Sequence, residues 1–397
     1  MSRHERTQIG IVGAGPAGLM LSHLLTRMGM DHVVVEARTR YEIETTHRAG
    51  ILEQGSADLL LDGVSDRILR DGYRHDGIDI RIEGESHPID FQALVGASTY
   101  LYPQTDVFID LADRAEASKV DVRYGLGPVS VDNLTEKPVI RYEADGEQVE
   151  ITCDLLIGAD GSRSACRRAI PESERRAMFR EYPFAWFGIL TETPPSHHEL
   201  IYARSSSGFA LVSQRTESLQ RLYFQCDATE RVEDWDDARI WQAFRDRLNF
   251  DGFEINEGPI TEKVVLPFRS FVSEPMRWGN LFLAGDAAHT VPPTGAKGLN
   301  LALQDVRILA EVLGEWNATG DDAVLDTYST RCLDRIWKAQ HFSYWMTSML
   351  HTNPEASEFD QRRSLGELRM ALDSEHGRAW LAEAYTGWPT GTGGNPR

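Results

Sequence analysis

The chain has 397 residues, 41% of them hydrophobic and 26% charged, which is ordinary for a globular protein of two or three domains. Its net charge of −20 argues against nucleic acid or an anionic membrane surface as a partner. The 4 cysteines are widely spaced, so we expect neither a disulfide framework nor a metal site, and we expect a cytoplasmic protein.

The N-terminal stretch from Gln8 to Glu36 predicts a strand, a glycine turn, a helix and a second strand. Residues 9–12 are an apolar run, residues 19–28 fit a helix, and residues 32–36 are a β-branched run that ends in an acid. This order is the setting in which a Gly-x-Gly-x-x-Gly turn binds a dinucleotide.

Each glycine of this turn meets a conformational or steric requirement. Gly13 permits the sharp bend, Gly15 lets the backbone approach a pyrophosphate, and Gly18 lets the helix lie close to the sheet. The free N–H groups at the helix start would then face the anion. Glu36 ends the second strand, where its carboxylate can accept hydrogen bonds from ribose hydroxyls.

Further along the chain, alternating segments predict two hairpins, one joining 77–82 to 86–91 and one closed by Asp145-Gly146. Residues 56–70 and 106–117 fit helices. Two apolar runs, at 155–160 and 281–286, end in Asp160 and Asp286 and predict parallel strands in the same sheet as the first.

The residue pattern changes along the chain and indicates separate domains, because the segment from about 182 to 271 is rich in β-like segments with aromatic residues. We expect an α/β protein with a Rossmann-like dinucleotide-binding domain, an inserted β-sheet substrate domain and a helical C-terminal region. The expected boundaries are 1–181 for the first part of the dinucleotide-binding domain, 182–271 for the substrate domain, 272–385 for the completion of the first domain with the helical region, and 386–397 for a flexible tail. An aromatic stripe between residues 331 and 351 predicts core or dimer interface.

A period-two pattern in the inserted domain predicts a site for a carboxylate. Ser213 and Arg215 share one strand face, and Arg221 and Tyr223 share one face of the next strand. A five-residue turn over 216–220 would place Arg215 opposite Arg221 and Ser213 opposite Tyr223. Two opposed guanidinium groups need an anion nearby, although a solvated strand face fits the pattern equally well.

The run Gly285-Asp286, the proline turn with Pro293 and the helix start at Leu299-Asn300 form a second specific motif. Together with the glycine turn and the mid-chain Asp160-Gly161, it resembles the flavoprotein aromatic hydroxylases, in which these motifs bind FAD. The resemblance extends to Tyr385 and is greatest to members that act on 4-hydroxybenzoate. It implies hydroxylation at the 3-position to 3,4-dihydroxybenzoate, with NADPH or NADH and O₂, through a flavin hydroperoxide.

The resemblance also implies roles for particular residues. Its FAD contacts are Gly13, Gly15, Gly18, Glu36, Arg48, Ala49, Gly50, Gln104, Asp160, Asp286, Leu299 and Asn300, with Arg221 helping the flavin to move. Its substrate contacts are Tyr202, Ser213, Gln214, Arg215, Tyr223 and Pro293. Tyr202, Tyr385 and His75 would carry a proton from the phenol, with Pro293 beside the ring.

Some departures and alternatives remain open at this point. Ala37 and Thr46 stand where NADPH-using members carry arginines, and Glu42 and Glu44 lie nearby, so we expect weak nucleotide preference or a lean to NADH. The resemblance implies a homodimer. Alternative hypotheses are a hydroxylase of another hydroxybenzoate, a dehydrogenase whose glycine turn binds NAD, and a flavin module that works through conformation.

Overall fold

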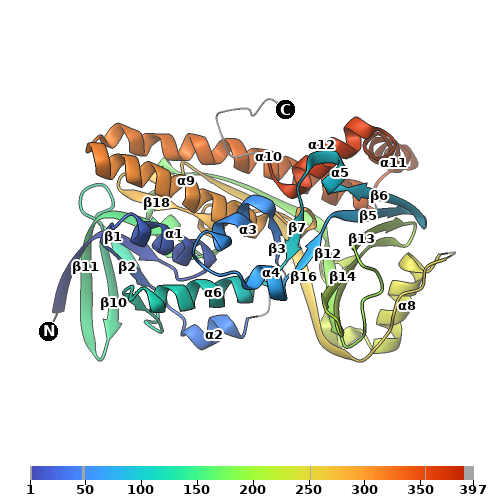
Figure 1. Cartoon of the computed structure of the whole chain (residues 1–397), viewed down its shortest axis with the longest axis horizontal. Helices are drawn as coiled ribbons and strands as arrows, with labels where there is room; N and C mark the ends of the chain where they lie inside the picture. Colours follow the sequence, from blue (N-terminus) through green and yellow to red (C-terminus); the bar gives the residue numbers. More distant parts are fainter. Residues whose placement is uncertain (1, 47–49, 251, 354, 389–397) are drawn as a thin grey trace.

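The computed structural model describes residues 2–46, 50–250, 252–353 and 355–388. Within these residues the strands form three sheets. Figure 1 shows the first sheet at one end of the elongated molecule and the second sheet at the other. This arrangement agrees with the expected fold class of a Rossmann-like part joined to a β-sheet part.

The first sheet has the order β17-β18-β11-β1-β2-β8, with β10 and β9 beside β11. Its strands are β1 (Ser2–Val12), β2 (His32–Val35), β8 (Val122–Arg123), β9 (Ser130–Asp132), β10 (Val139–Ala144), β11 (Glu147–Gly158), β17 (Arg277–Trp278) and β18 (Leu281–Leu283). Strands β18, β11, β1, β2 and β8 pair in parallel, which confirms the parallel strands predicted from the two apolar runs. The Asp145-Gly146 hairpin is also confirmed, between β10 and β11.

The second sheet has the order β19-β16-β12-β15-β14-β13-β5-β6. Its strands are β5 (Gly77–Ile82), β6 (Glu85–Asp90), β12 (Arg176–Thr191), β13 (Leu200–Ser205), β14 (Gly208–Thr216), β15 (Leu219–Asp227), β16 (Ile260–Glu274) and β19 (His289–Thr290). The predicted hairpin of β5 and β6 is confirmed, and it joins this sheet through β13. The sheet therefore draws on strands outside 182–271, and the domain boundaries stay a prediction.

A small third sheet links the two parts. It has the order β3-β7-β4, from β3 (Ile51–Glu53), β7 (Thr99–Leu101) and β4 (Tyr73–His75). The helices are α1 (Pro16–Arg27), α2 (Arg40–Glu44), α3 (Gln54–Leu61), α4 (Arg67–Asp71), α5 (Phe91–Val95), α6 (Gln104–Ala117), α7 (Ala165–Ala169), α8 (Asp237–Leu248), α9 (Gly298–Thr319), α10 (Thr327–Leu350), α11 (Glu358–Leu372) and α12 (Glu375–Thr386).

The two faces of the second sheet are covered by different elements because side chains alternate along each strand. One face, with Phe187 and Phe224, packs on Trp241 and Phe244 of α8. The other face carries Tyr202, Phe209 and Tyr223 and packs on residues of α10 and α12. Tyr202 and Tyr223 therefore lie on the buried side that faces the C-terminal helices.

The helices confirm most of the expected pattern and correct one part of it. The predicted helix 106–117 is α6, and the chain is largely helical from Gly298 onward. The predicted helix 56–70 is wrong as a single element, because it divides into α3 and α4. Gly63, in the left-handed region at φ 88°, lies between them and ends the helical path.

The aromatic stripe of α10 is partly buried and partly exposed to solvent. Phe342, Met346 and Trp345 are buried against α12 and the second sheet. Trp337 and Tyr344 are 43% and 39% exposed. The stripe therefore contributes some residues to the core and leaves others exposed on the surface.

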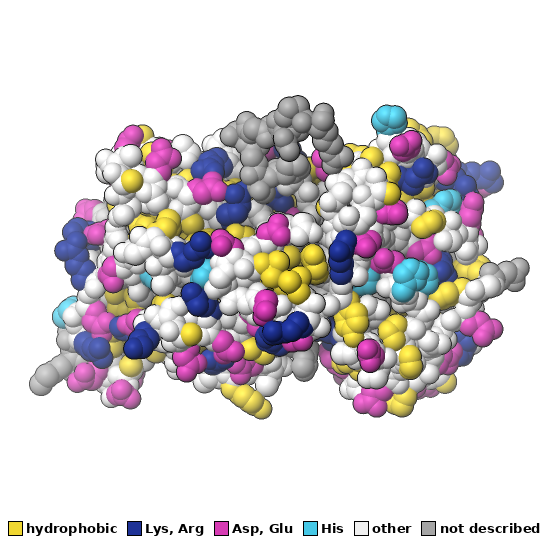
Figure 2. All heavy atoms as spheres, viewed as in Figure 1, with side chains coloured by type: hydrophobic (Ala, Val, Ile, Leu, Met, Phe, Trp, Pro, Cys, Tyr) yellow, Lys and Arg dark blue, Asp and Glu magenta, His cyan; other side chains and the backbone are white. Residues whose placement is uncertain are grey.

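Acidic and basic side chains are interspersed over the face of the molecule seen in Figure 2. The excess of acid is thus not gathered into one patch on this face. No helix among the described residues combines the length and the hydropathy needed to cross a bilayer.

Candidate active site

The glycine turn between β1 and α1 is tight at two positions and open at the third. A Cβ on Gly13 would lie 2.3 Å from the Ala159 carbonyl oxygen, and one on Gly18 would lie 1.9 Å from the Gly13 carbonyl oxygen. A Cβ on Gly15 would have no atom within 4 Å. Since no side chain caps the start of α1, its N–H groups face this open space, as a pyrophosphate requires.

Glu36 lies beside this turn at the end of β2. Its Oε2 accepts a hydrogen bond from the Ala14 N–H at 2.9 Å, and its Oε1 accepts one from the Arg38 N–H at 3.0 Å. These bonds fix a buried carboxylate next to the open space at Gly15. The turn and the acid therefore suit the pyrophosphate and ribose of FAD.

The start of α9 forms a second uncapped helix terminus. No side chain caps it, so the N–H groups of Leu299 and Asn300 are not bonded by a capping residue. The Asn300 side chain instead fixes β3, because its Nδ2 donates to the Ile51 carbonyl and its Oδ1 accepts from the Glu53 N–H. The terminus of this long helix favours negative charge, such as that of reduced flavin.

For the other predicted FAD contacts among the described residues, the structure gives the position of the residue and its contacts within the chain. A Cβ on Gly50 would lie 2.8 Å from the Gln104 nitrogen, so these two backbone segments touch. Asp286 lies in a short 3-10 turn, where its carbonyl accepts from Arg167 at 3.4 Å. Arg48 and Ala49 lie outside the described residues.

Asp160 has partners within its own loop. Its carboxylate accepts hydrogen bonds from the Ser164 hydroxyl at 2.5 Å and from the Ala165 and Cys166 N–H groups at 2.6 and 3.1 Å. It therefore fixes the start of α7. Any role of Asp160 toward FAD acts through this loop and stays a prediction.

A pair of buried tyrosines lies between β13 and α12. The hydroxyl oxygens of Tyr202 and Tyr385 are 2.8 Å apart, and the residues are 1% and 2% exposed. Burial raises the pKa of Tyr202 to about 12 and also raises the pKa of Tyr385 well above its usual value. Both phenols therefore stay protonated at neutral pH, which lets the pair pass a proton along without holding a charge.

His75, the third residue of the predicted relay, lies at the end of β4. It is buried, and its Nδ1 is 2.5 Å from the Glu199 carboxylate. Glu199 lies directly before β13, the strand that carries Tyr202. The structure therefore adds a carboxylate to which sequence reasoning assigned no role.

The predicted carboxylate clamp has a different register from the one expected. Ser213 lies opposite Arg221 and Leu211 lies opposite Tyr223, because the turn is shorter and β14 is irregular between Gln214 and Thr216. The expected pairs of Arg215 with Arg221 and of Ser213 with Tyr223 are wrong by two residues. A shift of two keeps Ser213 on the same face as Arg221 and Tyr223, whereas Arg215 lies within the irregular segment.

The charges of this cluster fit an anion. The Arg221 guanidinium donates to the Tyr223 hydroxyl at 3.4 Å and to Glu262 at 3.0 Å. Burial and the positive charge of Arg221 lower the pKa of Arg215. A carboxylate bound beside Arg215 would offset both effects.

Pro293 and Lys297 lie in the loop that leads into α9. Pro293 is exposed in a 3-10 turn, where its carbonyl accepts from the Ala296 N–H at 2.9 Å. Lys297 is fully buried and donates to Glu53 at 2.6 Å and to the Tyr385 carbonyl at 2.8 Å. Arg335 also contacts Glu53, at 2.9 Å. Lys297 and Arg335 therefore share one carboxylate, next to the backbone of Tyr385.

An aromatic box around His351 was not found by sequence reasoning. Trp186 donates through Nε1 to His351 Nε2 at 2.7 Å, and the His351 ring stacks on Phe184 and Phe209. Trp186 also contacts Tyr223, with ring centroids 4.8 Å apart. Since Trp186 and His351 are far apart in the chain, no local pattern points to this contact.

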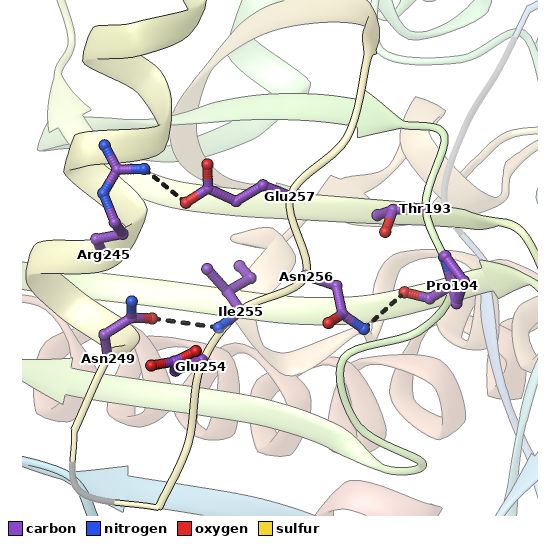
Figure 3. A pocket seen from close by; sticks show the side chains of 8 residues that line it. All are labelled: Thr193, Pro194, Arg245, Asn249, Glu254, Ile255, Asn256 and Glu257. Atoms are coloured by element: carbon purple, nitrogen blue, oxygen red, sulfur yellow. Dashed lines mark hydrogen bonds and ion pairs between the residues drawn. The ribbon is translucent and has the colours of Figure 1, made fainter.

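A hollow of about 510 Å³ lies beside α8, on the side of the second sheet away from the tyrosines. Its polar groups already bond one another, as Figure 3 shows: Arg245 pairs with Glu257, and Asn256 donates to the Pro194 carbonyl. It contains none of the predicted site residues. Its lining residues are Thr193, Pro194, Arg245, Asn249, Glu254, Ile255, Asn256 and Glu257.

Comparison with known proteins identifies the class. The family described as "FAD binding domain" matches residues 6–343. The chain belongs to this family, within the flavoprotein aromatic hydroxylases. It is 42% identical over 387 residues to a p-hydroxybenzoate hydroxylase of Acinetobacter baylyi, an alignment that covers 97% of this chain and 96% of that protein.

More distant relatives share the fold. A 3-(3-hydroxy-phenyl)propionate/3-hydroxycinnamic acid hydroxylase of Mycobacterium sp. strain JLS is 26% identical, over 81% of this chain and 56% of that protein. The p-nitrophenol 4-monooxygenase PnpA of Pseudomonas putida superposes with a TM-score of 0.82 at 18% identity, over 97% of this chain and 100% of that chain. The Diels-Alderase PyrE3 superposes at 0.77 and 21% identity, over 96% of this chain and 80% of that chain, so the fold alone does not fix the reaction.

The family assignment decides one alternative. A plain dehydrogenase whose glycine turn binds NAD does not explain a match to an FAD-binding family over residues 6–343. The residues at Gly15, Glu36 and the start of α9 fit FAD, as described above. The choice of aromatic substrate is the remaining question.

Proposed function

We propose that the protein hydroxylates 4-hydroxybenzoate at the 3-position. The overall reaction consumes one O₂ and one NADH or NADPH with a proton, and gives 3,4-dihydroxybenzoate, water and the oxidised nucleotide. The observation that carries the proposal is the buried hydroxyl pair of Tyr202 and Tyr385, 2.8 Å apart, in a chain 42% identical to a p-hydroxybenzoate hydroxylase. 4-Hydroxybenzoate carries a phenol and a carboxylate at opposite ends of its ring. The phenol would bind the tyrosine pair, and the carboxylate would bind the arginine cluster.

The carboxylate end is proposed to bind at the β14–β15 hairpin. Ser213 and Tyr223 share one face of the sheet, Arg215 interacts with Tyr223 electrostatically, and Gln214 pairs with Gln220 next to them. A guanidinium and two hydroxyls hold a carboxylate in one orientation. This orientation would decide which ring carbon is presented to the oxidant.

The phenol end is proposed to meet Tyr202. Tyr202 would take the phenol's proton as it passes its own to Tyr385, and the phenolate formed is the better nucleophile at its ortho carbon. Pro293, exposed in the proline turn, would lie at the side of the ring. The buried pair excludes water from this step.

FAD would be held by the glycine turn, by Glu36 and by the start of α9. When bound, FAD accepts hydride from the reduced nucleotide and brings oxygen from O₂ to the ring. The residues of this chain hold it at two helix termini that favour negative charge. Arg221, buried between Tyr223 and Glu262, is proposed to act on flavin position.

A homodimer and a cytoplasmic location are part of the proposal. The exposed aromatic residues Phe179, Trp337 and Tyr344 support a protein–protein contact on one part of the surface. Arg180 stacks on Tyr344, with 4.8 Å between the guanidinium carbon and the ring centroid. Light scattering of the purified protein would decide the oligomeric state, and a Trp337→Glu variant should then be monomeric.

The first test measures NADH and NADPH consumption with and without 4-hydroxybenzoate, and quantifies 3,4-dihydroxybenzoate in the same tube. Stimulation with matching product supports the proposal. Stimulation without product means that the ring binds while oxygen is lost as peroxide, and it favours another hydroxybenzoate as the substrate. A yellow protein without stimulation contradicts the proposed substrate and favours a flavin module.

A further inference from the structure

The contact between His75 and Glu199 is short, buried and made by separate elements. The Nδ1 of His75 lies 2.5 Å from Glu199 Oε2. The His75 side chain is 1% exposed, whereas that of Glu199 is 19% exposed. The pair therefore joins a fully buried ring to a carboxylate that reaches toward solvent.

The far side of the His75 ring lacks a partner within the described part of the chain. Its Nε2 is buried without a hydrogen bond, and so is the Oγ1 of Thr99, the residue directly opposite His75 in the β4–β7 ladder. Two buried polar atoms on paired residues are unusual, because such groups nearly always have a partner. They mark a place where a small polar group, such as a water molecule, completes the hydrogen bonding.

The bond to Glu199 fixes which nitrogen of His75 carries the proton. A carboxylate accepts hydrogen bonds, so Nδ1 must donate, and Nε2 of the neutral ring is then an acceptor. An Nε2 acceptor aimed at a buried polar space can receive a proton. The opposite tautomer would place an N–H there and block that step.

We propose that Glu199 is the positioning residue of the proton relay: it holds His75 with Nε2 ready to accept the proton that leaves Tyr385, and it stabilises the imidazolium that results. This inference rests on the proposed function. No covalent bond changes at Glu199. The proton moves from Tyr385 through the polar space near Thr99 to His75 Nε2, and the Nδ1 proton can then leave on the solvent side along Glu199.

The charge around Tyr385 agrees with this direction. Burial, the Tyr202 hydroxyl and then the Glu199 carboxylate raise the pKa of Tyr385. A negative charge near Tyr385 disfavours a tyrosinate there. Tyr385 must therefore pass one proton on as it receives another, without resting as a charged intermediate.

Several other titratable groups face the pair. Asp76, adjacent to His75 in the chain, is held by Arg74 and by the Ser98 hydroxyl. On the loop of Glu199, His197 Nδ1 lies 3.0 Å from the Glu199 carbonyl oxygen, and the His198 ring packs on His197. A pH profile of the relay therefore needs a variant that changes Glu199 alone.

Glu199→Gln is that variant, since it keeps the size of the side chain but offers an amide N–H. The amide can donate to Nδ1 and so favour the wrong tautomer of His75, as an Asp→Asn change does beside a catalytic histidine. We expect hydroxylation to slow at least about tenfold. The absorbance of bound 4-hydroxybenzoate phenolate should titrate at higher pH than in the unchanged enzyme, while FAD and substrate affinities and the melting temperature stay the same.

The matched control is Glu85→Gln. Glu85 also faces a histidine, His87, but at 3.7 Å and with the carboxylate 58% exposed. It should leave the phenolate titration and the rate unchanged. In a His75→Gln background, adding Glu199→Gln should cause no further loss, because the two residues act as one unit.

A second measurement does not depend on the Glu199→Gln variant. Nitrogen-15 NMR of the holoenzyme separates the two histidine tautomers, and the His75 signal can be assigned by its absence in His75→Gln. We expect Nδ1 to be protonated. An Nε2-protonated ring, or a Glu199→Gln enzyme with unchanged rate and phenolate titration, overturns the inference while leaving the proposed function intact. An unchanged enzyme that makes no 3,4-dihydroxybenzoate overturns the proposed function, and this inference with it.

Discussion

The FAD end and the relay end of the site differ in which atoms face the ligand. At the glycine turn, backbone atoms of residues 13–18 line the open space, and a Cβ would not fit at Gly13 or Gly18. At the relay, the facing atoms belong to side chains of β13, α12 and β4, which are distant in sequence. A backbone site depends on local chain geometry, whereas a side-chain site depends on tertiary packing. The two ends should therefore respond differently to mutation.

The largest effect is expected at Gly18. A Cβ there would lie 1.9 Å from the Gly13 carbonyl oxygen, so Gly18→Ala must displace α1 from the sheet. We expect a loss of at least about 3 kcal/mol in the free energy of unfolding, measured by denaturant titration without FAD.

Gly15→Ala is the matched control for Gly18→Ala. Its Cβ would meet nothing within 4 Å and its backbone is extended, so the apoprotein should keep its stability to within about 1 kcal/mol. FAD affinity should nevertheless fall at least about tenfold, since the methyl group occupies the space proposed for pyrophosphate. Normal FAD binding by Gly15→Ala would contradict this location.

These two glycines also show what the sequence could predict. The turn, the helix and Glu36 are contiguous, so composition and spacing indicated them directly. The Tyr202–Tyr385 contact spans 183 residues, and only the family resemblance suggested it. The contacts His75–Glu199 and Trp186–His351 span 124 and 165 residues and were missed, because nothing local distinguishes such side chains from core residues.

The clamp hairpin marks an intermediate case. Alternation along the strands correctly grouped Ser213, Arg221 and Tyr223 on one face. The register was wrong because the irregularity near Arg215 shortens the turn, and bulges leave little trace in a single sequence. Period-two patterns thus predict a face more reliably than they predict a partner.

At the relay end, Tyr385→Phe should remove function and leave the fold intact. Phenylalanine keeps the ring, which stacks on Phe91 at 5.2 Å, but loses the oxygen that contacts Tyr202. We expect hydroxylation to fall by about 100-fold or more, with FAD and substrate binding retained. Single-turnover product analysis would measure this, and an unchanged rate and yield would refute the role of Tyr385.

A smaller effect is expected from His351, on stability alone. Burial lowers its pKa from 6.5 to about 3, so the folded protein holds the neutral ring, with Nε2 accepting from Trp186 and Nδ1 donating to the Thr347 carbonyl. Stability from this residue is complete above about pH 6.5 and decreases as the pH falls toward 3. At pH 5 the loss should be about 2 kcal/mol.

His351→Gln isolates this contribution because it does not titrate. Its free energy of unfolding should change less between pH 7.5 and pH 5 than that of the unchanged protein. His23 and His32, whose pKa values burial also lowers, are present in both proteins and cancel in the difference. Identical pH dependence in the two proteins would show that His351 is not the acid-sensitive group.

The smallest effect concerns the preference between NADPH and NADH. We expect side chains near the glycine turn, and not the backbone geometry, to determine this preference. Arg40 is bound by the carboxylates of Glu44, Glu116 and Asp113, so its charge is already neutralised for a 2′-phosphate. We expect kcat/KM for NADPH to exceed that for NADH by no more than a few-fold, or to be lower, in paired initial-rate assays. Ala37 is exposed at the end of β2, and Ala37→Arg should raise the NADPH value several-fold while leaving the NADH value nearly unchanged. A strong NADPH preference in the unchanged enzyme would mean that other cations bind the phosphate and that the acidic partners of Arg40 do not govern selection.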